Sequence, residues 1–197
     1  CIEVLSRSDR MLISGGAGVG KSKLAVKILE ELAKEGFNPI VIQSSAIPLW
    51  DDLIHLFQSG KSYIVLFDDA NKSIQNLNYL LSIVDKPKAY TLKVIITSRD
   101  YIKKQVVNSL ESYSYEEIVL SEFKDEDIEK IILKDLPNLK YYLDIKRSII
   151  ELAKGNARVA LMATHSVVPG AETNYLSSPV LLYEEYFKKI EAEIGVF

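Results

Sequence analysis

The sequence predicts an α/β protein with a three-layer core around a five-stranded parallel sheet, followed by a helical subdomain. Over the first 120 residues, short apolar runs alternate with amphipathic segments, as in chains whose parallel strands are joined by helices. From about Ser121 only helical periodicity remains. We therefore expect a core over residues 1–120, a helical lid over 121–168 and the start of a helical or winged-helix segment over 169–197.

The predicted strands are short apolar runs bounded by polar or turn residues. They are 10–14 (RMLIS), 39–43 (PIVIQ), 63–69 (YIVLFDD), 92–98 (LKVIITS) and 116–120 (EEIVL). The third has five apolar residues in succession before two aspartates, which is typical of a strand buried on both faces. The residues that follow these strands are expected at the carboxyl edge of the sheet, where α/β proteins bind ligands.

The predicted helices have apolar residues at spacings of three and four. One follows the glycine cluster at residues 15–20 and is expected to end at Gly36. The others are 48–57, 74–84, 124–136, 145–155, 156–167 and 178–194, the last preceded by a loop with Pro169 and Gly170. The acidic start of 124–136 suits the positive end of a helix dipole.

Composition excludes several classes of protein. A net charge of −3 gives no overall positive field for nucleic acid or anionic lipid, and 48% hydrophobic content suits a soluble globular chain. No apolar run is long enough to span a membrane, and the start does not resemble a signal peptide. Cys1 is the only cysteine, so no internal disulfide is expected, and we expect a cytoplasmic location. The start at Cys rather than Met suggests a piece of a longer protein, with flanking domains that carry part of the function.

Residues 13–25 (ISGGAGVGKSKLA) contain the phosphate-binding pattern G-x-x-x-x-G-K-[ST]. Glycines let the backbone approach phosphate closely, and the loop N–H groups and the following helix favour an anion. Lys21 would neutralise the β- and γ-phosphates, and the Ser22 hydroxyl would bind Mg²⁺. The residues expected to contact ATP or ADP are Gly15, Gly16, Ala17, Gly18, Val19, Gly20, Lys21, Ser22 and Lys23. The alternative is a flexible strand-to-helix turn with a solvated lysine.

Asp68 and Asp69 follow the most apolar strand and are expected at the same edge of the sheet. There Asp68 could hold Mg²⁺, directly or through water. Asp69 could orient or deprotonate the attacking water. The alternative is an acidic turn at the end of a strand, without a role in catalysis.

The order of these motifs resembles the additional-strand class of P-loop NTPases, to which AAA+ and STAND ATPases belong. One whole strand separates the phosphate loop from the Asp68 strand, and the next strand ends in Thr97, Ser98 and Arg99. In that class a polar residue at this place senses the γ-phosphate. The resemblance implies this role for Arg99, whose fixed charge and fork of donors suit phosphoryl oxygens. A surface arginine that closes a strand is the alternative.

The segment GNARVALMA in the helical tail resembles the start of the lid helix in STAND proteins, including the NB-ARC group. In those proteins a G-x-P segment contacts the nucleotide. Gly155 and Asn156 match it, Ala157 stands where proline is usual, and Arg158 is placed like the second sensor arginine of AAA+ relatives. The resemblance implies nucleotide contacts by Asn156 and Arg158, and the missing proline favours a divergent or novel STAND branch. Arg158 as a solvated residue is the alternative.

The resemblance implies a P-loop NTPase core with a helical lid that binds ATP or ADP with Mg²⁺ and hydrolyses ATP slowly. ADP would hold a closed resting state, and ATP would favour an open state that self-associates. Many relatives act in immunity, cell death, antiviral defence or transcriptional control. Two alternatives stay open: an AAA+ type DNA-replication or clamp-loading ATPase, and a non-hydrolysing scaffold that uses bound nucleotide structurally.

Two other kinds of site find no support in the sequence. A GTPase would carry Asp-x-x-Gly after the Asp68 strand, and the segment NKSI (71–74) lacks the final aspartate that would read guanine. His55 and His165 are isolated on helical segments and do not form a metal site. The acidic stretch 111–135 is expected to be a solvated face.

Overall fold

The structure, a computed structural model, describes residues 5, 7–43, 47–84, 89–167 and 172–194. It divides the chain into two compact units. The core unit comprises Cys1–Gly16 and Gly20–Leu120, and the helical unit comprises Ala17–Val19 and Ser121–Phe197. The predicted loop with Pro169 and Gly170, like Cys1, lies outside the described residues.

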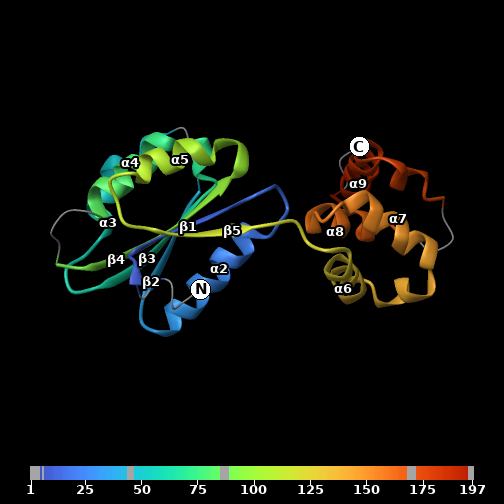
Figure 1. Cartoon of the computed structure of the whole chain (residues 1–197), viewed down its shortest axis with the longest axis horizontal. Helices are drawn as coiled ribbons and strands as arrows, with labels where there is room; N and C mark the ends of the chain where they lie inside the picture. Colours follow the sequence, from blue (N-terminus) through green and yellow to red (C-terminus); the bar gives the residue numbers. More distant parts are fainter. Residues whose placement is uncertain (1–4, 6, 44–46, 85–88, 168–171, 195–197) are drawn as a thin grey trace. The chain divides into compact units, whose positions relative to one another are not determined.

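The core unit is built on a five-stranded parallel sheet, as predicted (Figure 1). Its strands are β1 (Arg10–Gly15), β2 (Asn38–Gln43), β3 (Ser62–Asp68), β4 (Thr91–Arg99) and β5 (Glu116–Leu120). The strand order is β2-β3-β4-β1-β5, and every neighbouring pair is parallel. Strand β4 thus lies between β1 and β3, as in the additional-strand class that the motif order resembles.

The register of the strands brings three strand ends to one edge of the sheet. Gly15, the last residue of β1, lies opposite Arg99, the last residue of β4. Strands β3 and β4 are paired up to Phe67 and Ile96, so the next residue of each strand also reaches this edge. The start of the phosphate loop and the polar ends of β3 and β4 therefore lie at the same edge of the sheet.

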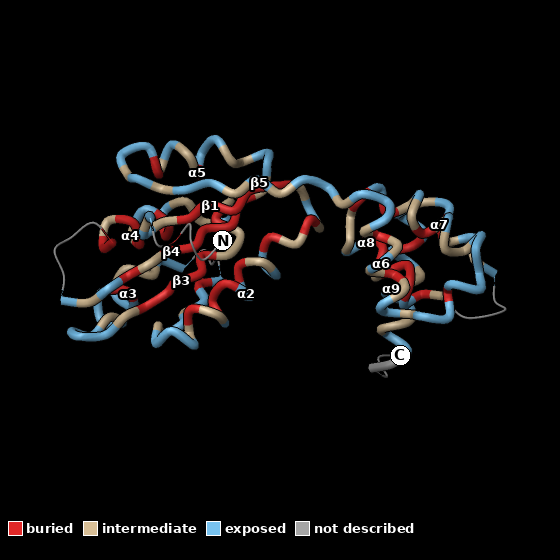
Figure 2. The backbone as a smooth tube through the Cα atoms, turned by 60° about the horizontal axis from the view of Figure 1, so that its bottom comes forward, coloured by how far each residue is buried: buried red, intermediate tan, exposed pale blue. Residues whose placement is uncertain are grey.

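Helices cover both faces of this sheet and complete the three layers. They are α2 (Lys21–Lys34), α3 (Trp50–Leu56), α4 (Ile74–Val84) and α5 (Lys103–Leu110), with 3₁₀ turns η1 (Ala70–Lys72) and η2 (Asp100–Ile102). Because side chains alternate along a strand, Leu12 joins a cluster with α3, α4 and α5, whereas Met11 and Ile13 join a cluster with α2. Strands β1, β3 and β4 are mostly buried, and β5 at the edge is largely exposed (Figure 2).

The structure confirms the predicted end of α2 and adds one helix that the sequence does not predict. After Lys34, the N–H of Gly36 donates to Ala33 O and that of Phe37 to Leu32 O, at 3.2 and 3.1 Å. Gly36 has φ 94°, a conformation that favours glycine and ends the helix. Helix α5 was missed because only Val106 and Leu110 among its eight residues are buried, which is too short a pattern to reveal a helix.

The helical unit has its own core. Its helices are α6 (Asp125–Asp135), α7 (Leu143–Ala153), α8 (Ala157–Ser166) and α9 (Pro179–Ile194), with 3₁₀ turns η3 (Pro137–Tyr141) and η4 (Asn174–Ser177). One apolar cluster joins them through Ile132 of α6, Ile149 of α7, Ala160 of α8 and Leu182 of α9. Helix α9 thus packs in the same cluster as α6, α7 and α8. The division expected between residues 168 and 169 stays a prediction.

The turn between α7 and α8 depends on Gly155. Lys154 and Gly155 both have positive φ, 44° and 75°. A Cβ on Gly155 would lie 2.6 Å from the carbonyl oxygen of Phe123, so a larger residue would collide with the backbone. Among the described parts of the chain, no helix is long and apolar enough to cross a membrane.

A polar cluster of Ser14, Lys103 and Glu117 ties β1 to its neighbours just before the phosphate loop. The buried Ser14 hydroxyl donates to Glu117 Oε1 at 2.6 Å, and Lys103 Nζ lies 2.7 Å from the same oxygen. Burial alone would raise the pKa of the Glu117 carboxyl. The hydrogen bonds from Lys103 and Ser14, with the charge of Lys103, outweigh burial and lower this pKa below its ordinary 4.5.

We expect Glu117→Gln to lower the free energy of unfolding by about 1 kcal/mol at pH 7. Folding lowers the pKa of Glu117. The ionised carboxylate therefore stabilises the folded state above the unfolded-state pKa, and this stabilisation is lost as pH falls through the folded-state pKa. The difference from wild type should therefore shrink as the pH falls below the ordinary glutamate pKa of 4.5. Urea unfolding at several pH values measures it, with Glu116→Gln as the exposed control. A difference that persists undiminished at the acid end would contradict this role.

Candidate nucleotide-binding site

The loop between β1 and α2 has a backbone that suits a phosphate group. Gly18 and Gly20 adopt φ 75° and 88°, a left-handed region that L side chains rarely enter. Gly20 is also the N-cap of α2, and it carries no side chain that could bind the first N–H groups of the helix. These N–H groups can therefore bind an anion.

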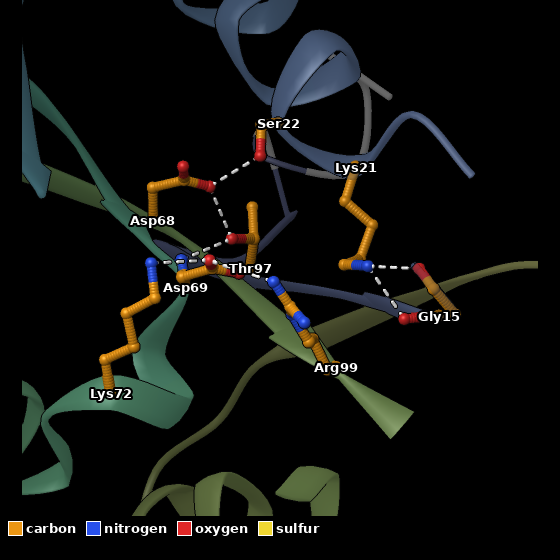
Figure 3. A network of polar contacts seen from close by, with 9 residues as sticks. Gly15, Lys21, Ser22, Asp68, Asp69, Lys72, Thr97 and Arg99 are labelled. Carbon is orange, nitrogen blue, oxygen red and sulfur yellow. Dashed lines mark hydrogen bonds and ion pairs between the residues drawn. The ribbon is translucent and has the colours of Figure 1, made fainter. Parts of the chain in front are cut away.

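Lys21 lies against the carbonyl groups of this loop. Its Nζ donates to Gly15 O at 2.8 Å and to Gly16 O at 2.5 Å. Figure 3 shows the Lys21 side chain turned toward Gly15. Burial lowers the pKa of the Lys21 ammonium from its ordinary 10.5, and the nearby carboxylates of Asp100 and Asp69 oppose that shift. The structure thus places the Lys21 ammonium group against the loop, where the motif predicts a phosphate-neutralising lysine. Lys23, also predicted, is exposed on α2.

The two predicted metal ligands are neighbours. The Ser22 hydroxyl donates to Asp68 Oδ1 at 2.8 Å (Figure 3). Both offer oxygen, the ligand that Mg²⁺ prefers, and Mg²⁺ in nucleotide sites uses few protein ligands besides phosphate oxygens and water. The described residues contain no group of three or more acidic, His or Cys side chains placed to hold a metal. The pair of Ser22 and Asp68 therefore fits Mg²⁺ that arrives with a nucleotide.

Thr97 connects the two aspartates. Its hydroxyl donates to Asp68 Oδ1 at 2.7 Å and accepts a hydrogen bond from the N–H of Asp69 at 2.8 Å. Thr97 is fully buried, and Asp69 has φ 52°, an uncommon conformation for a residue other than glycine. The sequence placed Thr97 at the right edge of the sheet but gave no sign of this bridge, because it depends on the pairing of β3 with β4.

Two cations meet on one oxygen of Asp69. Asp69 Oδ2 lies 3.0 Å from Lys72 Nζ and 3.7 Å from Arg99 Nη2 (Figure 3). The structure thus brings the predicted residues Asp69 and Arg99 together. It adds Lys72, which sequence reasoning missed. The available signal was the three-residue spacing from Asp69, which brings side chains together on a helical turn.

Asp100 is a second residue that sequence reasoning missed. It follows Arg99 directly and begins η2, beside the end of β1 where Gly15 starts the loop. Among the charged groups near Lys21, its carboxylate does most to raise the Lys21 pKa against the effect of burial. The available sequence signal was the position of Asp100 immediately after Thr97, Ser98 and Arg99.

The two predicted lid residues lie in the helical unit at the start of α8. Asn156 Oδ1 accepts hydrogen bonds from the N–H groups of Arg158 and Val159 at 3.0 and 3.2 Å. Asn156 is therefore the N-cap of this helix, which is sufficient to explain an asparagine here. The Arg158 side chain is exposed. Nucleotide contacts by Asn156 and Arg158 stay predictions.

Comparison with protein families agrees with this geometry. A family model described as Novel STAND NTPase 3 matches residues 1–151. The chain belongs to this family. It is accordingly an NTPase module, consistent with a phosphate loop beside two aspartates at one sheet edge. A comparison with curated proteins found no match for this member of the Novel STAND NTPase 3 family.

Solved structures resemble this family member in fold. The Thermotoga maritima RuvB Holliday junction branch migration motor is 17% identical, with a TM-score of 0.60 over 97% of this chain and 66% of that one. Drosophila ORC bound to DNA is 12% identical, with a TM-score of 0.59 over 98% and 66%. C. elegans PCH-2 is 14% identical, with a TM-score of 0.57 over 96% and 63%. At these identities the likeness is one of fold, that of AAA+ P-loop ATPases, and the chain spans about two thirds of those chains.

We expect Thr97→Val to lower the free energy of unfolding by about 1–2 kcal/mol, because it removes one partner each from the Asp69 N–H and Asp68 Oδ1. Valine matches threonine in shape, so the loss reports on the hydroxyl. Thr97→Ser keeps the hydroxyl and should cost less. Urea unfolding compares the three proteins. A valine variant as stable as wild type, beside a destabilised serine variant, would show that the methyl group, and not the bridge, is what matters.

Proposed function

We propose that this protein is a Mg²⁺-dependent ATPase that hydrolyses ATP slowly and whose nucleotide state controls its self-association. The observation that carries the proposal is the convergence of Lys21, Ser22, Asp68 and Asp69 at one edge of the sheet. The family supports the NTPase part of this proposal, and the resemblance to STAND proteins supports the switch.

In nucleotide binding, the loop N–H groups and Lys21 hold the phosphates. Lys21 exchanges the carbonyls of Gly15 and Gly16 for phosphate oxygens, which are stronger acceptors because they are charged. Ser22 and Asp68 hold the metal. When bound, Mg²⁺ offsets negative charge on the β- and γ-phosphate oxygens.

In hydrolysis, Asp69 orients a water molecule and accepts its proton. The water oxygen forms a bond to the γ-phosphorus, and the bond from that phosphorus to the β,γ-bridging oxygen breaks, with its electron pair leaving on ADP. The proton then passes to the phosphate product. Arg99 donates to the γ-phosphate oxygens and stabilises their charge, a role that suits its forked donors.

The switch rests on the lid residues that the family resemblance implies. Asn156 and Arg158 contact the nucleotide, ADP holds the closed state, and ATP releases it for self-association. P-loop enzymes that wait for an arginine from a partner turn over on the order of 10⁻⁴ to 10⁻² per second, which is the range expected here. We place the module in a signalling or defence protein of the cytoplasm, between sensor and effector domains.

A DNA-directed ATPase is the second candidate, because RuvB and ORC share the fold. The net charge of −3 opposes it, since binding to the phosphate backbone depends on clustered Lys and Arg. DNA binding that weakens steeply with salt would favour this candidate over the switch.

We expect Lys21→Ala to weaken Mg-ATP binding at least about tenfold, since it removes a charge-assisted contact to phosphate. Asp69→Asn should bind Mg-ATP normally and lose at least about 100-fold in kcat, as expected for a general base.

For both variants, calorimetry measures the binding of Mg-ATP, and phosphate release measures turnover. Lys27→Ala, an exposed lysine paired with Glu30 on α2, is the control.

Wild-type turnover by Asp69→Asn would remove the catalytic role of Asp69. Unchanged nucleotide-dependent assembly in that variant would favour the non-hydrolysing scaffold.

We also expect the purified protein to release close to one equivalent of ADP when it is denatured, because a closed resting state retains its product. Chromatography of the supernatant identifies the nucleotide. A protein that is empty as purified and binds Mg-ATP only weakly would contradict the closed resting state. It would favour the alternative of an AAA+ type DNA-replication or clamp-loading ATPase.

A further inference from the structure

Lys72 is the cation closest to Asp69, and neither the motifs nor the family assigns it a role. It is the last residue of η1, and its Nζ lies 3.0 Å from Asp69 Oδ2, nearer than Arg99. The Lys72 side chain is 57% exposed, whereas that of Asp69 is 22% exposed. The ammonium group thus binds the candidate catalytic carboxylate from the solvent side.

The backbone fixes this pair independently of the two side chains. The Lys72 N–H donates to Asp69 O at 2.9 Å and closes the 3₁₀ turn. At its start, the Asp69 N–H is held by the buried Thr97 hydroxyl. A change in the Lys72 side chain therefore leaves the turn and the position of Asp69 in place.

An ammonium group on Oδ2 competes with the water that Asp69 must orient. Oδ2 already faces two cations, and both compete with a water molecule that would donate to this oxygen. In the proposed function Arg99 turns to the γ-phosphate when ATP binds. Lys72 then remains as the cation on Asp69.

We propose that Lys72 is a positioning residue that restrains the Asp69 carboxylate in an ion pair and keeps basal ATP hydrolysis slow. This inference rests on the proposed function, in which Asp69 acts on water. The restraint is modest, because an ion pair this exposed is screened by solvent and opens readily. Its removal is therefore expected to change the rate by about two- to fivefold.

The test uses Lys72→Met, which keeps most of the side-chain length and removes the charge. We expect kcat for Mg-ATP to rise by about two- to fivefold. The Kd for Mg-ADP and for a non-hydrolysable Mg-ATP analogue should stay within about twofold of wild type, and Tm should not move, because the turn is held by backbone bonds. Lys72→Arg keeps the charge and should retain the wild-type rate.

Lys130→Met is the matched control. It removes an exposed pair of the same spacing, Lys130 with Asp127 at 2.9 Å on α6, and should change neither kcat nor Kd. The double variant Asp69→Asn/Lys72→Met should be as inactive as Asp69→Asn alone, since the restraint acts through Asp69.

Several results would overturn the restraint and leave the ATPase proposal standing. These are an unchanged or lower kcat in Lys72→Met with normal nucleotide binding, an equal rise in Lys130→Met, or a rise that persists in the double variant. A wild-type protein that binds neither Mg-ADP nor Mg-ATP would instead overturn the ATPase proposal together with the restraint.

Discussion

The site depends on the carboxylate of Asp68, whose Oδ1 accepts hydrogen bonds from Ser22 of α2 and Thr97 of β4. One oxygen atom thus joins the helix that follows the phosphate loop to two neighbouring strands. This is possible only because β4 is inserted between β1 and β3, which carries Thr97 to the side of Asp68. Thr97 links this oxygen to the N–H of Asp69, whose carboxylate forms the ion pairs with Lys72 and Arg99.

Opposite charges face one another at this edge of the sheet. Lys21 lies in the field of the carboxylates of Asp68, Asp69 and Asp100 and of the Arg99 guanidinium. In the described structure the cations bind the protein itself: Lys21 binds loop carbonyls, and Arg99 binds Asp69. A polyphosphate competes for Lys21, because charged oxygens are better acceptors than backbone carbonyls. It also competes for Arg99, whose contact with Asp69 is long at 3.7 Å. In the proposed function, nucleotide binding therefore rearranges these contacts, which would give the proposed switch its physical basis.

Much of the fold and part of the site could be predicted from the sequence. The glycine spacing, the apolar run before Asp68 and the segment ending in Arg99 predict the parallel sheet and the edge that carries the site. Helix α5 could not be predicted, because it buries only Val106 and Leu110. Lys72 was missed for a different reason: its three-residue spacing from Asp69 is a weak signal until the 3₁₀ turn that brings the two side chains together is known.

The sequence by itself determined which chemistry the chain can perform, because the residue types and spacing of the phosphate loop and of the two aspartates are local properties. Tertiary structure alone decided which of these groups touch. The three cations Lys21, Lys72 and Arg99 look alike as charges in a sequence, yet one binds the loop and two meet on Asp69. Thr97 becomes a bridge, and not simply the end of a strand, because parallel pairing places it beside Asp68. The contacts of Thr97 with Asp68 and of Arg99 with Asp69 arise from register and strand order, which bring together residues about thirty positions apart.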